Sequence, residues 1–286
     1  VARSFAGVDV RPGTEVPDGW TGKSWACATG VAIADGDVLL FLDADVTLAD
    51  DAIASLLTTW EELHGLVSVQ PHHHIERPFE SLSLPFNVVA LMALGGGSLL
   101  PPRREWGASG PCLVTSRADY DAVGGHHGVA GAIAEDLALA ERFVAAGLPV
   151  HCLGGGDRIR FRMYRDGRSL VEGWSKNVAT GARRTPILRG IGISLWVTAL
   201  LTMALRVIEG PGDSFAETAA FLLSYAAGAV QVALLGRRVG RFGPAALVWP
   251  VLIGFFVAVF LLSAVRTLLL RRVRWSGRTV VLAEHR

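Results

Sequence analysis

The sequence predicts an α/β domain with a mostly parallel sheet, followed by transmembrane helices. Over residues 1–187, short apolar runs of strand length alternate with helical patterns, which is typical of α/β folds. The mean hydropathy of +0.39 is high for one soluble domain of 286 residues. The apolar excess lies after residue 187, in three stretches that contain no charged residue. We therefore expect a catalytic or binding domain that is attached to a membrane.

The expected elements of the first part follow from local patterns. Val38–Leu42 is a continuous apolar run, as in a parallel strand that is covered on both faces. Gly147 marks the end of the expected helix Ile133–Ala146. Gly and Pro are frequent over residues 12–22, which indicates a loop. In chain order we expect the strand Val8–Arg11, the helix Ser24–Ala34, the strand Val38–Leu42, the helix Asp50–His64, the strand Leu66–Gln70, a helix over 79–94, the strand Cys112–Ser116, the helix Ile133–Ala146 and the strand Val150–Leu153.

The three apolar stretches, Gly190–Leu205, Thr218–Gly236 and Phe242–Val265, have the lengths of membrane segments. At 1.5 Å per residue the second would be about 28 Å long, close to the ~30 Å hydrocarbon core of a bilayer. The first stretch is too short to span the bilayer core unless its flanking arginines extend to the membrane surface. Alternatively, it is a buried core helix of the domain. We predict a domain over 1–187, a membrane region of two or three helices over 188–270, and a basic tail over 271–286.

Positive charge predicts the orientation of these segments. Arginines at 183–184 and at 237–241 would both lie in the cytoplasm if the first two stretches cross the membrane. A third crossing would place the arginines of the tail outside. We therefore expect the third stretch, which contains Pro250, to re-enter the membrane from the cytoplasmic side. The predicted protein is a multi-pass protein of the cell (inner) membrane with a cytoplasmic catalytic domain.

Composition excludes some functions. The net charge of +1 gives no indication of nucleic-acid binding. The three cysteines, Cys27, Cys112 and Cys152, are odd in number and lack the spacing of metal ligands, so we expect them to be reduced.

Two acids at the end of the strand Val38–Leu42, in the stretch VLLFLDAD, are the first candidate site. Ligands of open α/β sheets bind beyond the carboxyl ends of the strands, and the spacing of Asp43 and Asp45 can aim both at one side. Paired carboxylates suit Mg²⁺ or Mn²⁺, which would neutralise a diphosphate. The alternative is that these aspartates only form a turn.

Further motifs give the acids a context. GWTGKSWA lies upstream, and EDLALAERFVAAG, RMYRDGRSLVEGWSKN and RWSGR follow downstream. In this order they resemble the membrane-attached family 2 glycosyltransferases with the GT-A (Rossmann-like) fold, especially the hopene-associated enzymes and those that glycosylate carotenoid acids of the diaponeurosporenoate type. The resemblance covers roughly Gly19 to Arg278. Each motif is weak alone, whereas the ordered set is specific.

The resemblance implies roles for individual residues. Asp43 and Asp45 would hold the divalent cation, Mg²⁺ or Mn²⁺, and the diphosphate of the sugar nucleotide. Asp136 would be the general base toward the acceptor, although acids also favour a helix N-terminus for electrostatic reasons alone. The implied donor-binding residues are Trp20, Gly22, Lys23, Trp25, Asp43, Asp45, Arg162, Tyr164 and Lys176.

The implied reaction is the inverting transfer of one sugar from a nucleotide-sugar, most simply UDP-glucose, to a membrane lipid such as a carotenoid acid or a hopanoid. Such a displacement needs stabilisation of the leaving group and a base on the opposite side. The metal with Lys23 or Arg162 would supply the first, and Asp136 the second. A carboxylic-acid acceptor is already ionised and needs no base.

The chain departs from the family pattern in two places. A complete GT-A domain opens with a strand, a helix and a second strand whose acid contacts uracil, and no such segment precedes Val1. We therefore expect an N-terminally incomplete domain. The Q-x-x-R-W motif of processive synthases is absent, which favours a single transfer over chain growth.

Two other functions stay open. One is a polyprenyl-phosphate sugar transferase. The other is a non-catalytic or metal-handling membrane module that uses His72–His74 together with Asp43 and Asp45. Against a zinc site, consecutive side chains of an extended segment point in alternate directions, and zinc sites prefer separated ligands.

Overall fold

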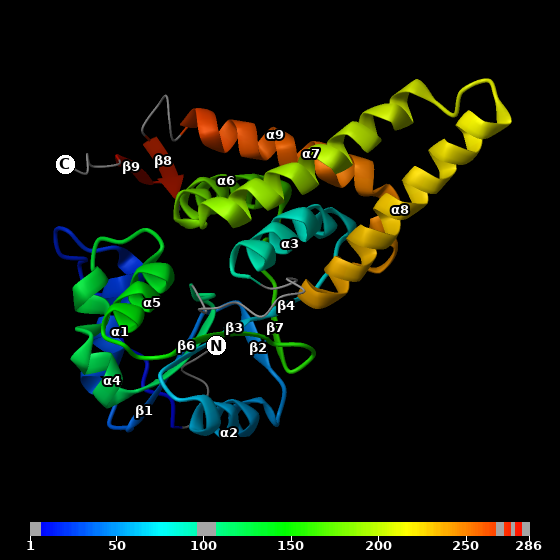
Figure 1. Ribbon diagram of the computed structural model, residues 1–286. Coiled ribbons are helices and arrows are strands. Elements are labelled where there is room, and N and C mark those ends of the chain that lie inside the picture. The colour runs from blue at the N-terminus through cyan, green and yellow to red at the C-terminus, as the bar shows by residue number, and fades with distance from the viewer. Residues whose placement is uncertain (1–6, 96–106, 267–271, 276–277, 282–286) are drawn as a thin grey trace.

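The computed structural model describes residues 7–95, 107–266, 272–275 and 278–281 (Figure 1). In chain order its elements are α1 (Gly22–Ile33), β1 (Val38–Leu42), β2 (Val46–Leu48), α2 (Ala52–Leu63), β3 (Leu66–Gln70), β4 (His72–His73), the 3₁₀ helix η2 (Pro78–Ser83), α3 (Leu84–Ala93), β5 (Cys112–Ser116), α4 (Arg117–Ala122), the 3₁₀ helix η3 (Gly125–Val129), α5 (Glu135–Ala145), β6 (Val150–Gly154), β7 (Ile159–Phe161), α6 (Gly167–Arg184), α7 (Ile187–Glu209), α8 (Phe215–Val239), the 3₁₀ helix η4 (Gly243–Val248), α9 (Trp249–Ala264), β8 (Arg272–Trp275) and β9 (Arg278–Val281).

The main sheet has four strands in the order β1-β5-β3-β6. β5 is antiparallel to both β1 and β3, and β3 is parallel to β6. It follows that β1, β3 and β6 run in one direction and β5 runs against them. The prediction of an α/β domain is confirmed, and the sheet is mixed, because two of its three strand pairings are antiparallel. A smaller sheet, β2-β7-β4, continues from the end of β1. The carboxyl end of β1 therefore lies where the two sheets meet.

Apolar side chains cover both faces of the main sheet. β3 is buried over its whole length, as expected of a strand with a layer on each side. Leu139 and Phe143 of α5 pack on one face, and Leu56 of α2 packs on the other. Val123, which follows α4, contributes to the same cluster as α5. This packing fixes α5, whose N-terminus carries the predicted base, against the sheet.

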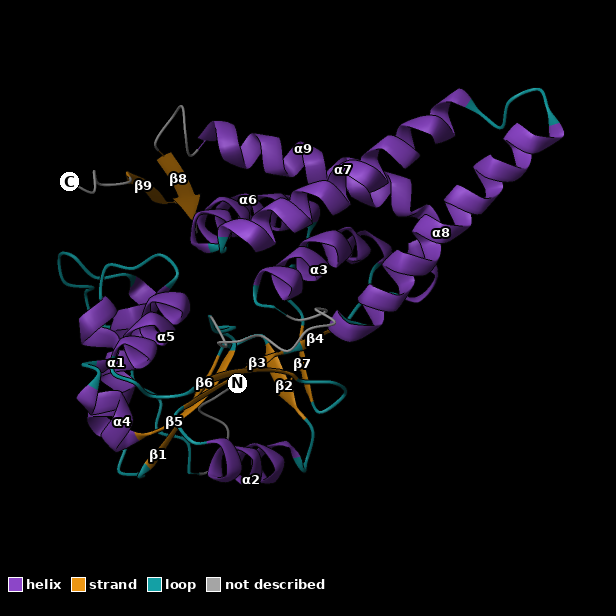
Figure 2. Ribbon diagram, in the orientation of Figure 1, coloured by secondary structure: helices purple, strands orange, loops and turns teal. Residues whose placement is uncertain are grey.

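The C-terminal helices form a separate layer. Figure 2 shows the two larger sheets in one half of the molecule and α3, α6, α7, α8 and α9 in the other. α9 packs against both α6 and α7, and α3 packs against α8. Within the described residues, three segments are long and apolar enough to cross a membrane: Ile187–Glu209, Phe215–Val239 and Gly243–Ala264. Because only 11% of the first is buried, it is not a core helix, which was the alternative for this stretch.

Several expected elements differ from the structure. The predicted strand Val8–Arg11 is wrong: these residues lie in a loop, and their polar contact is the local ion pair of Arg11 with Asp9. The helix expected over 79–94 is divided into η2 and α3, because Pro85 at the start of α3 provides no N–H for a continuous helix. β2, β4 and β7 were not expected, since runs of two or three residues carry no periodicity.

Candidate active site

The loop after β1 carries the two predicted metal ligands. The backbone N–H of Asp43 donates to the carbonyl of Pro111 at 2.9 Å, and the carbonyl of Asp43 accepts from Val46 at 3.1 Å. The carbonyl of Asp45 accepts from the N–H of Arg162 at 3.2 Å, next to the pairing of β2 with β7. The D-x-D loop is thus fixed by β5 on one side and by β7 on the other.

Lys23 links the loop to α5. Its Nζ lies 2.8 Å from Oδ1 of Asp43 and 2.9 Å from Oε1 of Glu135, which is buried. Thr21 caps α1 by accepting from the N–H of Ser24, so Lys23 is held in the first turn. Burial disfavours the ammonium, but the carboxylates of Glu135 and Asp43 outweigh it and raise the pKa of Lys23. Lys23 therefore stays charged and bridges two acids that come from different elements.

Asp136 lies beside this bridge. Its Oδ2 accepts from the N–H of Gly110 at 2.8 Å, and a Cβ on Gly110 would lie 2.8 Å from the same oxygen. A glycine at position 110 is what lets the carboxylate approach the backbone. Burial and then the charge of Glu135 raise the pKa of Asp136 to about 6. A carboxylate with such a pKa is suited to accept a proton near neutral pH.

Asp43 and Asp45 fit a divalent cation. Burial and then the charge of Asp43 raise the pKa of Asp45, so the two carboxylates repel one another. A cation between them would relieve this repulsion. Among the described residues no group of three or more His, Cys, Asp or Glu side chains could hold a metal. An ion such as Mg²⁺ would need only one or two protein carboxylates, because phosphate and water complete its shell.

Tyr164 presents a polar atom without a partner near this loop. It is 9% exposed, and its hydroxyl makes no hydrogen bond within the described part of the chain. Burial and then the charge of Asp45 raise the pKa of Tyr164. Its ring packs on α6, where a Cβ on Gly173 would lie 2.4 Å from the ring. The ring is seated among apolar side chains, and the hydroxyl is buried against α6, where a Cβ on Gly173 would lie 2.5 Å from it.

The model of the family described as "Glycosyl transferase family 21" matches residues 13–286. The chain belongs to this family. It is 35% identical to the 4,4'-diaponeurosporenoate glycosyltransferases of Staphylococcus aureus strains USA300 and NCTC 8325, over 97% of this chain and 76% of theirs. The protein of the same description from strain MRSA252 is 34% identical. The predicted resemblance, the α/β fold and the assignment as a glycosyltransferase are confirmed.

Among the other residues expected to bind the donor, three cluster at the start of α1. Trp20 makes edge contacts with Trp25 and with His127, at centroid distances of 5.2 and 4.8 Å. The indole of Trp25 donates to Thr14 at 2.8 Å. Gly22 opens α1 next to Lys23. Their contact with a donor stays a prediction for this family 21 protein.

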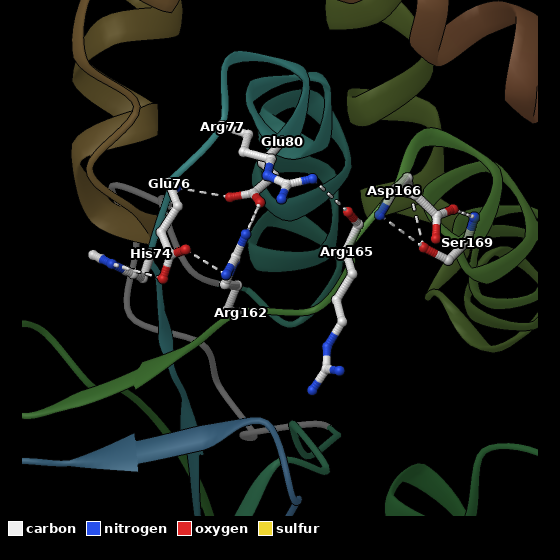
Figure 3. A network of polar contacts seen from close by, with 8 residues as sticks. All are labelled: His74, Glu76, Arg77, Glu80, Arg162, Arg165, Asp166 and Ser169. Carbon is white, nitrogen blue, oxygen red and sulfur yellow. Dashed lines mark hydrogen bonds and ion pairs between the residues drawn. The ribbon is translucent and has the colours of Figure 1, made fainter.

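Arg162 and Lys176 lie farther from the bridge of Lys23. The guanidinium of Arg162 is paired with Glu76 and Glu80 (Figure 3). Both partners come from the segment that leads into α3. Lys176 lies in α6, but its side chain is outside the described part of the structure. Direct contact of either residue with the donor stays a prediction.

The histidines near the site are used within the protein. His126 is buried, its Nδ1 lies 2.8 Å from the Tyr120 hydroxyl, and burial lowers its pKa to about 4. Nε2 of His72 lies 3.1 Å from the carbonyl of Arg237, and Nδ1 of His73 lies 3.2 Å from the Asn87 amide. His72 and His73 thus have separate partners, and neither those contacts nor the described acids near them support a shared metal site.

A hollow of about 450 Å³ extends from Lys23, Asp43 and Glu135 along α1 and β1. His126 and Gly110 also line it.

Two acids of the structure were not predicted to have a role. The sequence places Glu135 next to the predicted base without indicating a function for it, and it does not single out Glu80. The only sequence signal for Glu80 is a single acid within the apolar run PFESLSLPF.

Proposed function

We propose that the protein transfers a single glucose residue from UDP-glucose, with inversion, to the carboxylate of a carotenoid-acid-like lipid. The observation that carries the proposal is the group of carboxylates at the end of β1, where Asp43 and Asp45 lie next to a Lys23–Glu135 bridge and to Asp136. Support for the acceptor comes from the relatives, which are described as acting on 4,4'-diaponeurosporenoate.

Different residues of the chain assist the leaving group and the acceptor in an in-line displacement. A Mg²⁺ or Mn²⁺ ion held by Asp43 and Asp45 would offset the charge of the diphosphate as the bond to the sugar breaks. Lys23 keeps Asp43 in place through the contact at 2.8 Å and adds positive charge beside the leaving group. Donor binding by Tyr164 stays a prediction, and its hydroxyl is buried against α6.

Asp136 acts on the acceptor side. With a hydroxyl acceptor, an acceptor oxygen forms the bond to the anomeric carbon, UDP leaves with the bonding electrons, and Asp136 takes the acceptor's proton. With a carboxylic acid, the acceptor is ionised before the reaction, so no proton is transferred. Asp136 then helps only by shaping the site.

A panel of donors and acceptors tests the proposed function. Purified protein in lipid nanodiscs would receive radiolabelled UDP-glucose, UDP-galactose or GDP-mannose, together with a carotenoid acid, a lipid alcohol or a polyprenyl phosphate. We expect the fastest transfer from UDP-glucose to the acid. Mild alkali should release the sugar from this product, because the two are joined by an ester. Transfer to polyprenyl phosphate alone would contradict the proposal.

The membrane arrangement is part of the proposal, and its first element is a hairpin. Arg189, near the start of α7, donates to the carbonyl of Ala93 at 3.1 Å, so α7 begins beside α3. At the end of α8, the N–H of Arg241 donates to His73 of β4 at 3.2 Å. Figure 1 shows the connection between α7 and α8 projecting away from the sheets. Helices of 23 and 25 residues are about 35 Å and 38 Å long, enough to cross a bilayer twice.

The third apolar segment, η4–α9, is proposed to be re-entrant: it enters the helical layer and returns to the catalytic side. The indole of Trp249, at the start of α9, donates to the carbonyl of Tyr225 at 3.1 Å. Tyr225 lies 14 residues, or about 21 Å, before the end of α8. At the other end of α9, Ser263 donates to the carbonyl of Ser175 in α6, which is joined to the catalytic sheets through β7. The segment η4–α9 thus begins and ends beside the catalytic part and crosses no membrane in this arrangement.

Labelling of single cysteines tests the topology. In a background without the three native cysteines, Asp213→Cys reports the α7–α8 connection and Glu284→Cys reports the C-terminal tail. We expect a membrane-impermeant maleimide to label Asp213→Cys in intact cells and Glu284→Cys only after permeabilisation. Labelling of Glu284→Cys in intact cells would indicate three crossings and contradict the re-entrant segment.

A further inference from the structure

The ammonium of Lys23, beside the hollow, has two unequal partners. Its Nζ lies 2.8 Å from Oδ1 and 3.1 Å from Oδ2 of Asp43, so it faces both oxygens of that carboxylate. It also lies 2.9 Å from Oε1 of Glu135. The side chain of Glu135 is 9% exposed, whereas those of Asp43 and Lys23 are 33% and 31% exposed. Lys23 therefore joins a buried acid to an acid that solvent and ligands can reach.

The two elements that meet at the buried acid are held together by their backbones. The N–H of Thr21, which caps α1, donates to the carbonyl of Ala130 at 2.8 Å. Gly131 lies so close to Gly19 that a Cβ on it would be 2.9 Å from the carbonyl oxygen of Gly19. Both α1 and α5 also pack against η3, and Figure 1 shows the two helices on the same side of the sheets. The start of α1 is thus fixed next to the segment that leads into α5.

Burial makes the contact of Lys23 with Glu135 the harder one to break. A buried carboxylate that loses its partner becomes an uncompensated charge away from water, which is strongly destabilising. A partly exposed carboxylate such as Asp43 can exchange its partner for water or for another cation, because ion pairs at exposed sites contribute little stability. Lys23 can therefore leave Asp43 while it stays on Glu135, and the reverse is unfavourable.

The hollow is where such an exchange would matter. Lys23, Asp43 and Glu135 all line it. An ammonium on both oxygens of Asp43 occupies the atoms that a divalent cation would take as ligands, so Lys23 and the cation compete for the same carboxylate. An ammonium also has three N–H donors, and the contact with Glu135 uses one of them. When Lys23 leaves Asp43, its other donors are free for an anion in the hollow.

We infer that Glu135 is a positioning residue that anchors Lys23, and that Asp43 is the exchangeable partner of the same lysine. Before the donor binds, Lys23 keeps Asp43 in place. On donor binding, Lys23 releases Asp43 to the cation, stays on Glu135 and donates to an oxygen of the diphosphate. The exchange transfers no proton and breaks no covalent bond. This inference rests on the proposed sugar transfer and gives Glu135 a role in binding the donor.

Binding of Mn²⁺ and of UDP tests the exchange without a measurement of turnover. The full chain in lipid nanodiscs is titrated with Mn²⁺ alone, followed by the electron paramagnetic resonance of free Mn²⁺. It is then titrated with UDP at saturating Mn²⁺ in a calorimeter. Because Asp43 loses its competitor, we expect Lys23→Met to bind Mn²⁺ alone about threefold more tightly, a change typical of a partly exposed ion pair. It should bind UDP at least about tenfold more weakly, the cost of one charge-assisted hydrogen bond.

Glu135→Gln distinguishes an anchor from a simple charge. Glutamine keeps the shape of the side chain and removes the charge that holds Lys23. If Glu135 acted only through its charge, this variant would bind the anionic UDP more tightly. Without its anchor, Lys23 stays on Asp43, so we expect weaker binding of Mn²⁺ alone and at least about tenfold weaker binding of UDP. In the double variant with Lys23→Met, the change at Glu135 should have no further effect on UDP affinity.

The control is Arg158→Met, which removes a cation from the exposed pair with Asp51 at 2.7 Å and should leave both affinities unchanged. If Lys23→Met does not fold, the double variant replaces it, because it lacks both members of the buried pair, and it should bind Mn²⁺ more tightly than Glu135→Gln. UDP binding that is unchanged or tighter in Glu135→Gln would overturn the inference, as would additive effects on UDP affinity. A wild type that binds UDP no better with Mn²⁺ than without it would instead contradict the proposed function.

Discussion

Replacing Asp45 with asparagine is expected to lower kcat/KM for sugar transfer at least about 100-fold, as for other lost groups that stabilise charge in a transition state. Asparagine keeps the size of the side chain and removes its charge. The charge matters because the carboxylates of Asp43 and Asp45 would together hold the cation that neutralises the diphosphate. Asp43 is also held by Lys23, whereas the described structure shows no ion pair of the Asp45 side chain, so its free carboxylate is the one left for a ligand.

Titration with UDP separates this effect from a loss of folding. Wild-type protein should bind UDP more tightly with Mn²⁺ than with excess chelator, and Asp45→Asn should bind equally weakly in both. Asp51→Asn is the matched control, because Asp51 pairs with Arg158 at an exposed site on the start of α2. Full turnover of the wild type in excess chelator would refute the assignment of Asp43 and Asp45 to a metal.

The parts of the fold that sequence predicts are those with a strong local signal. β1, β3 and β5 were expected with the same bounds that the structure has, because each is a short, largely apolar segment of five residues between turn signals. The reversed direction of β5 could not be predicted, since strand direction depends on the path of the connecting chain. β4 and β7 pair over two residues, and that pairing depends on contacts far apart in the sequence.

In the candidate site, too, local patterns can be read from the sequence, whereas contacts between distant residues cannot. The acids at 43, 45 and 136 could be found from motifs, because their spacing is local. The bridge from Lys23 to Glu135 joins residues more than 100 positions apart, and Glu80 meets Arg162 across 82 positions. Arg162 has the residue type of a phosphate ligand, and only the fold reveals that two acids already occupy its guanidinium. The sequence therefore indicates candidate residues, and the contacts of each one are seen only in the fold.

Replacing Asp136 with asparagine is expected to separate two classes of acceptor. Asparagine can still accept from the N–H of Gly110, which is 2.8 Å from Oδ2 of Asp136, but it cannot take a proton. Transfer to a hydroxyl lipid should fall by ~10²–10⁴-fold, the usual contribution of a positioned base. Transfer to a carboxylic-acid lipid should fall much less, because that acceptor has no proton to give up at neutral pH. UDP binding should be unchanged.

The folded protein should tolerate this substitution. The pKa of Asp136 is raised from 3.8 to about 6, which means that the folded state disfavours the ionised carboxylate. At pH 7 the group is ionised in both the folded and the unfolded chain, so its charge destabilises the fold there. This cost declines as the pH falls from about 6 toward 3.8. A neutral asparagine removes the cost. The Tm of Asp136→Asn at pH 7 should therefore equal or exceed that of the wild type.

The pH dependence of turnover gives the sharpest evidence on the base. Since Asp136 accepts a proton only when ionised, wild-type transfer to a hydroxyl lipid should decline as the pH falls through about 6. The same decline should be absent from the residual activity of Asp136→Asn, and it should be absent from wild-type transfer to an acid lipid. Turnover of both proteins with both lipids between pH 5 and 8 measures this, at saturating donor. If the mutant matches the wild type with the hydroxyl lipid at every pH, Asp136 serves only to begin α5.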